Sequence, residues 1–184
     1  MKRTLVISGS GGQGVMSAGV MIAQTAVDAG NCATYLPEYG PEQRGGSAKC
    51  TVVVDEDEII SPLASKCDTL IVMNEQAYEK FAKTLRAGGI LVANTSRIDS
   101  EIKKDSFTVV EVPADDLAVE LGNIKCANII LIGALVGSEA GIISEEAILK
   151  SLDKKFASKK KEVLELNHKA LQKGIEYGKK AISK

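Results

Sequence analysis

The chain has 184 residues, of which 45% are hydrophobic and 26% charged, with a formal net charge of −1 at pH 7. This composition is typical of a globular protein with its own core and excludes a disordered chain. The balanced charge gives no general attraction for nucleic acid or an anionic membrane. The basic run Lys159–Lys161 is interpreted as a solvated helix face.

The longest strongly apolar stretch, Ile129–Val136, is far shorter than the roughly 18 residues of a membrane span. Near the N-terminus, the glycines of Gly9–Gly14 interrupt any signal-like apolar segment. We therefore expect a cytoplasmic protein with no membrane partner. The four cysteines are Cys32, Cys50, Cys67 and Cys126. They form no C-x-x-C pair and sit beside apolar residues, so we expect buried, reduced thiols and no metal or iron–sulfur site.

The first two thirds of the chain alternate between predicted strands and predicted helices. Strands are predicted at Thr4–Ser8, Cys32–Leu36, Ala48–Val54, Thr69–Met73, Ile90–Ala93 and Phe107–Val112. Helices are predicted at Val15–Ala29, at Glu75–Leu85 (ended by Gly88 and Gly89), and from Pro113 onward. This alternation predicts an α/β fold, with a mostly parallel sheet of about six strands and helices on both faces. We expect residues 1–184 to form a single Rossmann-like domain.

The rest of the chain is predicted to be helical. The segment Ala127–Ala140 is apolar nearly all round, which indicates a buried helix. Its glycines fall four residues apart on one face: Gly133, Gly137 and Gly141. We favour tight packing of this face on the sheet; a subunit contact through it is the alternative. Separately, a homodimer is an alternative for the isolated chain. In the last helix, about Lys159–Lys180, His168 lies on the apolar stripe and is interpreted as a packing or hydrogen-bonding residue.

A glycine-rich loop follows the first predicted strand. Gly9, Gly11 and Gly14 have the G-x-G-x-x-G spacing that binds a dinucleotide pyrophosphate at the start of a helix. That motif also needs an acidic residue after the second strand, and Glu38 stands 24 residues after Gly14. The alternative is a glycine turn that packs against another part of the backbone. The spacing alone leaves both interpretations open.

The loop Glu38–Gly46, with sequence EYGPEQRGG, carries more specific information. Glycine turns bracket Pro41–Arg44, which predicts a stiff polar projection that exposes a carboxylate, an amide and a guanidinium. Such a projection suits recognition of an anion or of a partner surface. Both loops follow the carboxyl ends of predicted strands, so we expect them on the same side of the molecule.

Three segments together resemble a known family. GSGGQGV at Gly9–Val15, YGPEQRGG at Tyr39–Gly46 and ANIILIGALVG at Ala127–Gly137 are similar to the γ subunit of 2-oxoacid:ferredoxin oxidoreductases. The resemblance runs through nearly the whole chain, and the second motif looks most like the 2-oxoglutarate enzyme (2-oxoglutarate synthase). Pyruvate, branched-chain 2-oxoacid and indolepyruvate versions are alternatives within the family. A stand-alone NAD- or FAD-binding protein is the alternative of another class.

The resemblance implies a role in a complex that oxidatively decarboxylates a 2-oxoacid with coenzyme A, giving an acyl-CoA such as succinyl-CoA, carbon dioxide and reduced ferredoxin. In that family thiamine diphosphate is held by the α and β parts, and iron–sulfur clusters by β or a ferredoxin-like δ part. This chain lacks a GDG thiamine-type motif and a C-x-x-C-x-x-C cluster motif. We therefore expect α, β and δ partners, no cofactor bound by this chain alone, and no catalytic residue in it.

The resemblance also suggests what the two loops do. The interface or gate residues would be Tyr39, Pro41, Glu42, Gln43, Arg44, Gly45 and Gly46. A secondary role is contact with the anionic coenzyme A, for which Gly11, Gly12, Gln13, Gly14 and Arg44 are suited.

Overall fold

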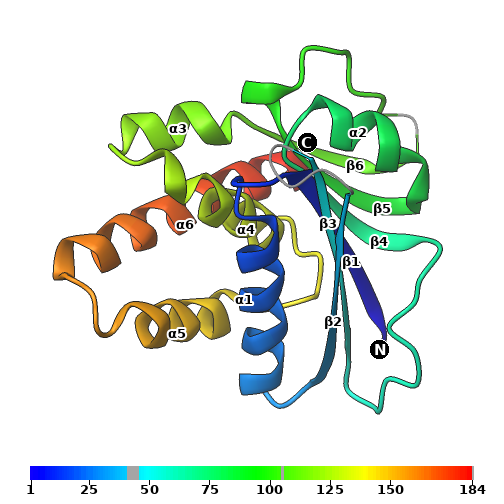
Figure 1. The fold of residues 1–184 in the computed structure, drawn as a ribbon, viewed down its shortest axis with the longest axis horizontal. Coiled ribbons are helices and arrows are strands. Elements are labelled where there is room, and N and C mark those ends of the chain that lie inside the picture. Colours follow the sequence, from blue (N-terminus) through cyan, green and yellow to red (C-terminus); the bar gives the residue numbers. More distant parts are fainter. Residues whose placement is uncertain (41–45, 105, 184) are drawn as a thin grey trace.

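A computed structural model describes residues 1–40, 46–104 and 106–183. Within these residues, six strands form one sheet in the order β2-β3-β1-β4-β5-β6 (Figure 1). The strands are β1 (Arg3–Ser10), β2 (Cys32–Tyr39), β3 (Ser47–Asp55), β4 (Cys67–Val72), β5 (Leu85–Asn94) and β6 (Thr108–Val112). The expected strands are thus all present, most of them longer than predicted.

Five of the six described strands run in the same direction. β1, β4, β5 and β6 pair in parallel, whereas β3 is antiparallel to both β1 and β2. The reversal of β3 follows from chain length, because a parallel crossover needs a dozen or more residues and residues 40–46 are too few. The predicted mostly parallel sheet is confirmed, with β2 and β3 as a hairpin at one edge.

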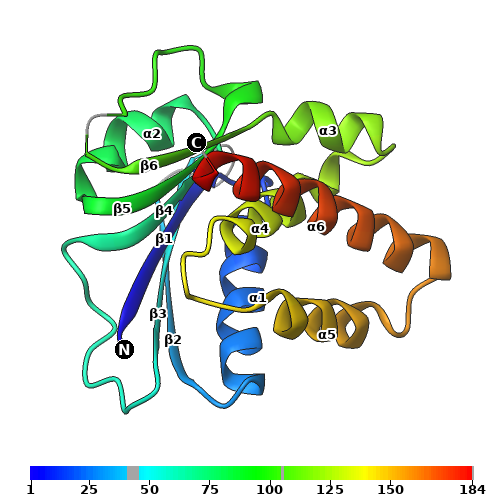
Figure 2. The same cartoon turned by 180° about the vertical axis from the view of Figure 1, so that it is seen from behind.

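Helices cover both faces of the sheet, as predicted (Figures 1 and 2). They are α1 (Val15–Asp28), α2 (Glu75–Phe81), α3 (Ala114–Glu120), α4 (Ala127–Gly137), α5 (Glu145–Phe156) and α6 (Lys161–Ile182). Alternate residues of β1 divide the core: Leu5 and Ile7 face α1 and α4, whereas Val6 faces the side of α2. No helix in the described part of the chain is long and apolar enough to cross a membrane.

The glycine face of α4 packs on α6, not on the sheet as predicted. A Cβ at Gly133 would lie 2.1 Å from Leu171 O, and one at Gly174 of α6 would lie 1.9 Å from Ile130 O. Glycine therefore lets the two backbones touch. The face is filled within the chain and is not free for a subunit contact. Gly141 lies beyond α4, which ends at Gly137.

Several local predictions need correction. Cys50, Cys67 and Cys126 are buried as expected, and burial raises the pKa of the Cys50 thiol to about 12, but Cys32 is exposed. Gly88 and Gly89 do not end a helix; they lie inside β5, in the stretch where its register with β4 shifts.

Nε2 of His168, in α6, lies 2.8 Å from Asp153 Oδ1 of α5. The interpretation of His168 as a packing or hydrogen-bonding residue stays a prediction.

Candidate functional site

The two loops singled out in the sequence meet in the structure. The N–H of Gly11 donates to the carbonyl of Gly46 over 3.1 Å, and Ser10 pairs with Ser47 at the ends of β1 and β3. The prediction that both loops share one side is confirmed. Tyr39 is 74% exposed at the end of β2. The other predicted loop residues, Pro41, Glu42, Gln43, Arg44 and Gly45, lie outside the described residues.

The glycines after β1 serve the packing of the loop. A Cβ at Gly9 would lie 2.7 Å from Gln13 Oε1 and 2.8 Å from Met73 Cβ. Gly14 caps α1 with φ 81°, and a Cβ there would lie 2.6 Å from Asn128 Nδ2. Two of the three spaced glycines thus have a structural reason to lack a side chain.

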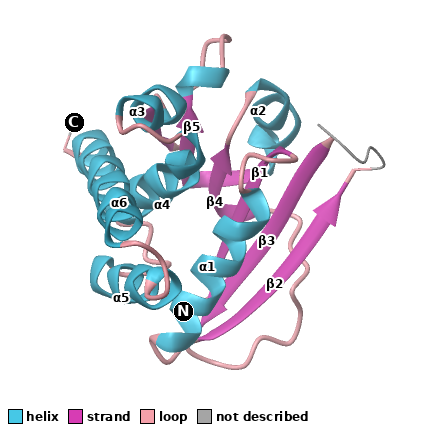
Figure 3. Cartoon of the chain, turned by 60° about the vertical axis from the view of Figure 1, so that its left-hand side comes forward, coloured by secondary structure: helices cyan, strands magenta, loops and turns pink. Residues whose placement is uncertain are grey.

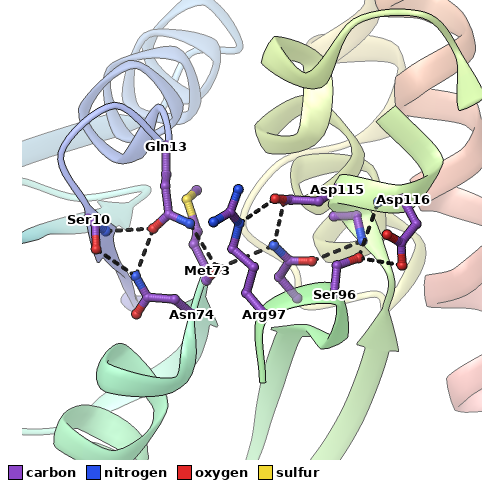
Figure 4. Close-up of polar contacts among 10 residues, drawn as sticks. Ser10, Gln13, Met73, Asn74, Ser96, Arg97, Asp115 and Asp116 are labelled. Carbon is purple, nitrogen blue, oxygen red and sulfur yellow. Dashed lines mark hydrogen bonds and ion pairs between the residues drawn. The ribbon is translucent and has the colours of Figure 1, made fainter. Parts of the chain in front are cut away.

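Gln13 folds back into its own loop (Figure 4). Its Oε1 accepts from Ser10 N (2.6 Å) and from Asn74 Nδ2 (2.8 Å), while its Nε2 donates to Met73 O (3.2 Å). Asn74 Nδ2 also donates to Ser10 Oγ (2.8 Å), and its Oδ1 caps α2 at Ala77 N. The glycine loop is therefore fixed to the carboxyl end of β4.

A second set of bonds fixes the ends of β5 and β6. Asn94 is 1% exposed; its Nδ2 donates to Asp115 Oδ1 (2.8 Å) and Met73 O (3.3 Å), and its Oδ1 accepts from Ala114 N (3.0 Å). Arg97 Nε donates to the other carboxylate oxygen of Asp115. Met73 O thus accepts from both amide side chains, Gln13 and Asn94, and joins the two sets into one polar network.

This network borders a cavity of about 320 Å³ that we call the switch-point cavity. It lies at the carboxyl ends of the strands, where α1 follows β1 on one face and α2 follows β4 on the other, a common place for ligands in α/β folds. The lining residues are Gly12, Gln13, Gly14, Ser17, Met73, Asn94, Arg97, Asp115, Ile124, Lys125, Ala127, Asn128 and Leu131.

The charges around the cavity favour an anion. Arg97 and Lys125 supply two cations against the one carboxylate of Asp115, and the N-terminus of α1 adds its positive dipole end. The amides of Gly11 and Gln13 are already bonded, to Gly46 O and Ser10 O. Neither Gly12 N nor Gly14 N bonds to another described residue, so these two of the four predicted amides can still reach a ligand.

The strand order separates Glu38 from the glycine loop. In dinucleotide-binding folds the second strand lies beside the first, but here β3 stands between β2 and β1, which puts them about 10 Å apart. Glu38 instead pairs with Lys49 Nζ at 2.5 Å. The same Nζ lies over the ring of Phe81, the last residue of α2. Glu38 thus faces the side opposite α1 and does not complete the motif.

Sequence reasoning missed Asn74, Asn94, Arg97, Lys125 and Asn128. The signal that could have found the first two is a polar residue directly after a buried strand, as in VMN and VAN. Lys125 lies just before α4, and Asn128 lies in the first turn of α4. Only the fold brings these two residues beside Gly14. Within the described residues, no group of three His, Cys, Asp or Glu side chains could hold a metal ion.

A family model described as pyruvate ferredoxin/flavodoxin oxidoreductase matches residues 4–177. The chain belongs to this family. Relatives include the ketoisovalerate oxidoreductase subunit VorA of Methanothermobacter marburgensis (34% identical, covering 95% of this chain and 36% of VorA). Another is the 2-oxoglutarate synthase subunit KorC of Methanocaldococcus jannaschii (31% identical, 97% of this chain and 95% of KorC). The chain thus spans about a third of the length of VorA.

Solved structures of the family have the same fold. The gamma subunit of a keto/oxoacid ferredoxin oxidoreductase from Geobacter sulfurreducens has a TM-score of 0.84 at 28% identity, covering 98% of both chains. The 2-oxoglutarate:ferredoxin oxidoreductase of Magnetococcus marinus, solved with 2-oxoglutarate, coenzyme A and succinyl-CoA, has a TM-score of 0.88 at 25% identity, covering 97% of this chain and 31% of that one. The resemblance to the family's gamma subunits is confirmed.

Proposed function

We propose that residues 1–184 form the gamma subunit of a 2-oxoacid:ferredoxin oxidoreductase, with 2-oxoglutarate as the first candidate substrate. The observation that carries this proposal is the meeting of the two motif loops, through Gly11 N and Gly46 O, in a chain that matches the family over residues 4–177. The complex would convert the 2-oxoacid and coenzyme A to an acyl-CoA, carbon dioxide and reduced ferredoxin in the cytoplasm.

In this proposal the chain has no catalytic residue. Alpha, beta and ferredoxin-like delta partners hold thiamine diphosphate, which supplies the decarboxylation chemistry, and the iron–sulfur clusters, which carry electrons. The segment Tyr39–Gly46 contacts the partners near the entrance of their active site. The amides of Gly12 and Gly14, with Arg97 and Lys125 across the switch-point cavity, contact the anionic coenzyme A.

Sequence identity does not select the 2-oxoacid. The ketoisovalerate, 2-oxoglutarate and pyruvate relatives are 34%, 31% and 33% identical to this chain. The test is to purify the chain with its partners and measure ferredoxin reduction with 2-oxoglutarate, pyruvate, ketoisovalerate and indolepyruvate. We expect the highest kcat/KM with 2-oxoglutarate. Preference for another acid would overturn the substrate, and no reduction with any acid would overturn the function.

Arg44→Ala tests the loop contact. We expect weaker assembly of the complex or a rise of about ten-fold in the KM for coenzyme A, because a charge-assisted hydrogen bond is lost. Gel filtration and steady-state kinetics measure the two effects. The control is Arg86→Ala, since Arg86 pairs with Asp68 at the other end of the strands. An Arg44→Ala complex that assembles and reacts like the wild type contradicts this role.

A further inference from the structure

One long segment of the chain is almost free of charge. From Thr4 to Pro37 the only charged residue is Asp28, although 26% of the whole chain is charged. Burial explains this for β1, whose central residues are inaccessible. It does not explain α1 or β2, because both lie at the surface, and surface helices normally carry charged residues on their outer side.

The apolar residues of this segment gather on one outer surface. Met16, Val20, Ala23 and Val27 follow one another at helical spacing along α1, with Val20 50% and Val27 48% exposed. Tyr35 and Tyr39 project from β2 toward the same side, and the hydroxyl of Tyr35 donates to Met16 Sδ over 3.3 Å. We call these six residues the α1/β2 face. Figure 3 shows α1 beside β3, with β2 beyond it at the edge of the sheet.

Scattered exposed apolar residues need no explanation, but a continuous group marks a contact surface. The contrast with α5 is clear: that helix has acidic residues in its first turn and Lys154 and Lys155 in its last. Lys154 reaches Asp28 at 3.1 Å and so forms the charged border of the face. β2 adds an edge strand whose outer side has no partner strand in the described sheet.

The lengths of two relatives indicate what covers the face. In VorA of Methanothermobacter marburgensis and in the Magnetococcus marinus enzyme, the region equivalent to this chain makes up 36% and 31% of a longer polypeptide. A domain of this kind therefore works beside a further, larger part. Uncharged, apolar surfaces are typical of permanent interfaces, whereas transient interfaces are more polar.

We propose that the α1/β2 face is the docking surface for the polypeptide equivalent to the rest of these longer relatives. The partner presents an uncharged, apolar surface that buries Val20, Val27 and Tyr39. This inference rests on the proposed function, because it places the assembly of the gamma subunit on a defined face.

The test uses the polypeptide, from the same genome, that matches the remainder of VorA. It is tagged and co-expressed with this chain, and the chain retained on it is quantified. We expect Val20→Lys and Val27→Lys each to lower retention about ten-fold or more, since a lysine charge would be buried without a partner. Leu63→Lys, on the connection from β3 to β4 and 73% exposed, is the matched control and should be retained like the wild type. Thermal melting of each isolated variant checks that the fold is kept.

The outcomes separate the two proposals. If the wild type is retained and a folded Val20→Lys/Val27→Lys double variant is retained equally well, the docking surface is wrong and the proposed function stands. If the wild type is not retained at all, both are wrong. If the chain alone is a dimer in light scattering and Val20→Lys makes it a monomer, a second copy covers the face and the docking proposal is overturned.

Discussion

Three amide side chains connect the loops around the switch-point cavity. Gln13, Asn74 and Asn94 each use both a donor and an acceptor, so each can join two backbone segments at once. Sequence reasoning placed Gln13 in a candidate loop but could not show its bond to Asn74, because the two lie 61 positions apart. Only the pairing of β1 with β4 brings them together.

Asn94→Ala tests how much this network contributes. The substitution leaves the N–H of Ala114 and the carbonyl of Met73 each without one bond in a buried site. We expect the free energy of unfolding to fall by about 1–3 kcal/mol, measured by urea denaturation.

Asn94→Asp keeps the acceptor for Ala114 N but places a carboxylate beside Asp115, so it should not restore stability at neutral pH. Ser96→Ala, at a less buried bond to Asp116 nearby, should change stability by much less. A loss for Asn94→Ala no larger than for Ser96→Ala would contradict this account.

Among the elements, the pair α4 and α6 shows what periodicity can and cannot predict. The four-residue glycine spacing predicted close backbone approach, and the approach is there. The choice of partner was wrong, because spacing on one helix does not say which element fits against it. The complementary glycines of α6, Gly174 and Gly178, carry that information, and they have the same spacing.

Gly174→Ala should destabilise the protein strongly. A Cβ there would lie 1.9 Å from Ile130 O and 2.8 Å from Ala134 N, both backbone atoms, so the helices must separate. We expect a loss of about 3 kcal/mol in the free energy of unfolding, although alanine is the better helix former. Lys173→Ala, at the neighbouring exposed position of α6, is the control and should change stability by less than about 0.5 kcal/mol. Equal stability of the Gly174→Ala variant and the wild type would show that the helices can move apart freely.

At the scale of the whole molecule, the sequence predicted the strands of the sheet but not their order. Alternating apolar runs predicted the α/β sheet and its six strands, because strand and helix periodicities differ. The insertion of β3 between β2 and β1 was not predicted, since no local pattern distinguishes a hairpin strand from a crossover strand. That one insertion decides how the glycine loop is interpreted.

The strand order predicts that the isolated chain does not bind NAD(H) or FAD through the glycine loop. Two features act together: Gln13 Oε1 already accepts from Ser10 N, and Glu38 is held by Lys49 on the face away from α1. A dinucleotide pyrophosphate at this loop could reach only the amides of Gly12 and Gly14, because those of Gly11 and Gln13 are already bonded, and its ribose would find no carboxylate. Isothermal titration with NAD(H) and FAD should show no heat of binding at ligand concentrations up to about 1 mM.

Gln13→Gly, which removes this side chain from the loop, tests which of the two features matters more. If this variant binds while the wild type does not, Gln13 is the barrier; if neither binds, the position of β2 is sufficient. Saturable binding by the wild type would mean that the spacing of Gly9, Gly11 and Gly14 outweighs both features.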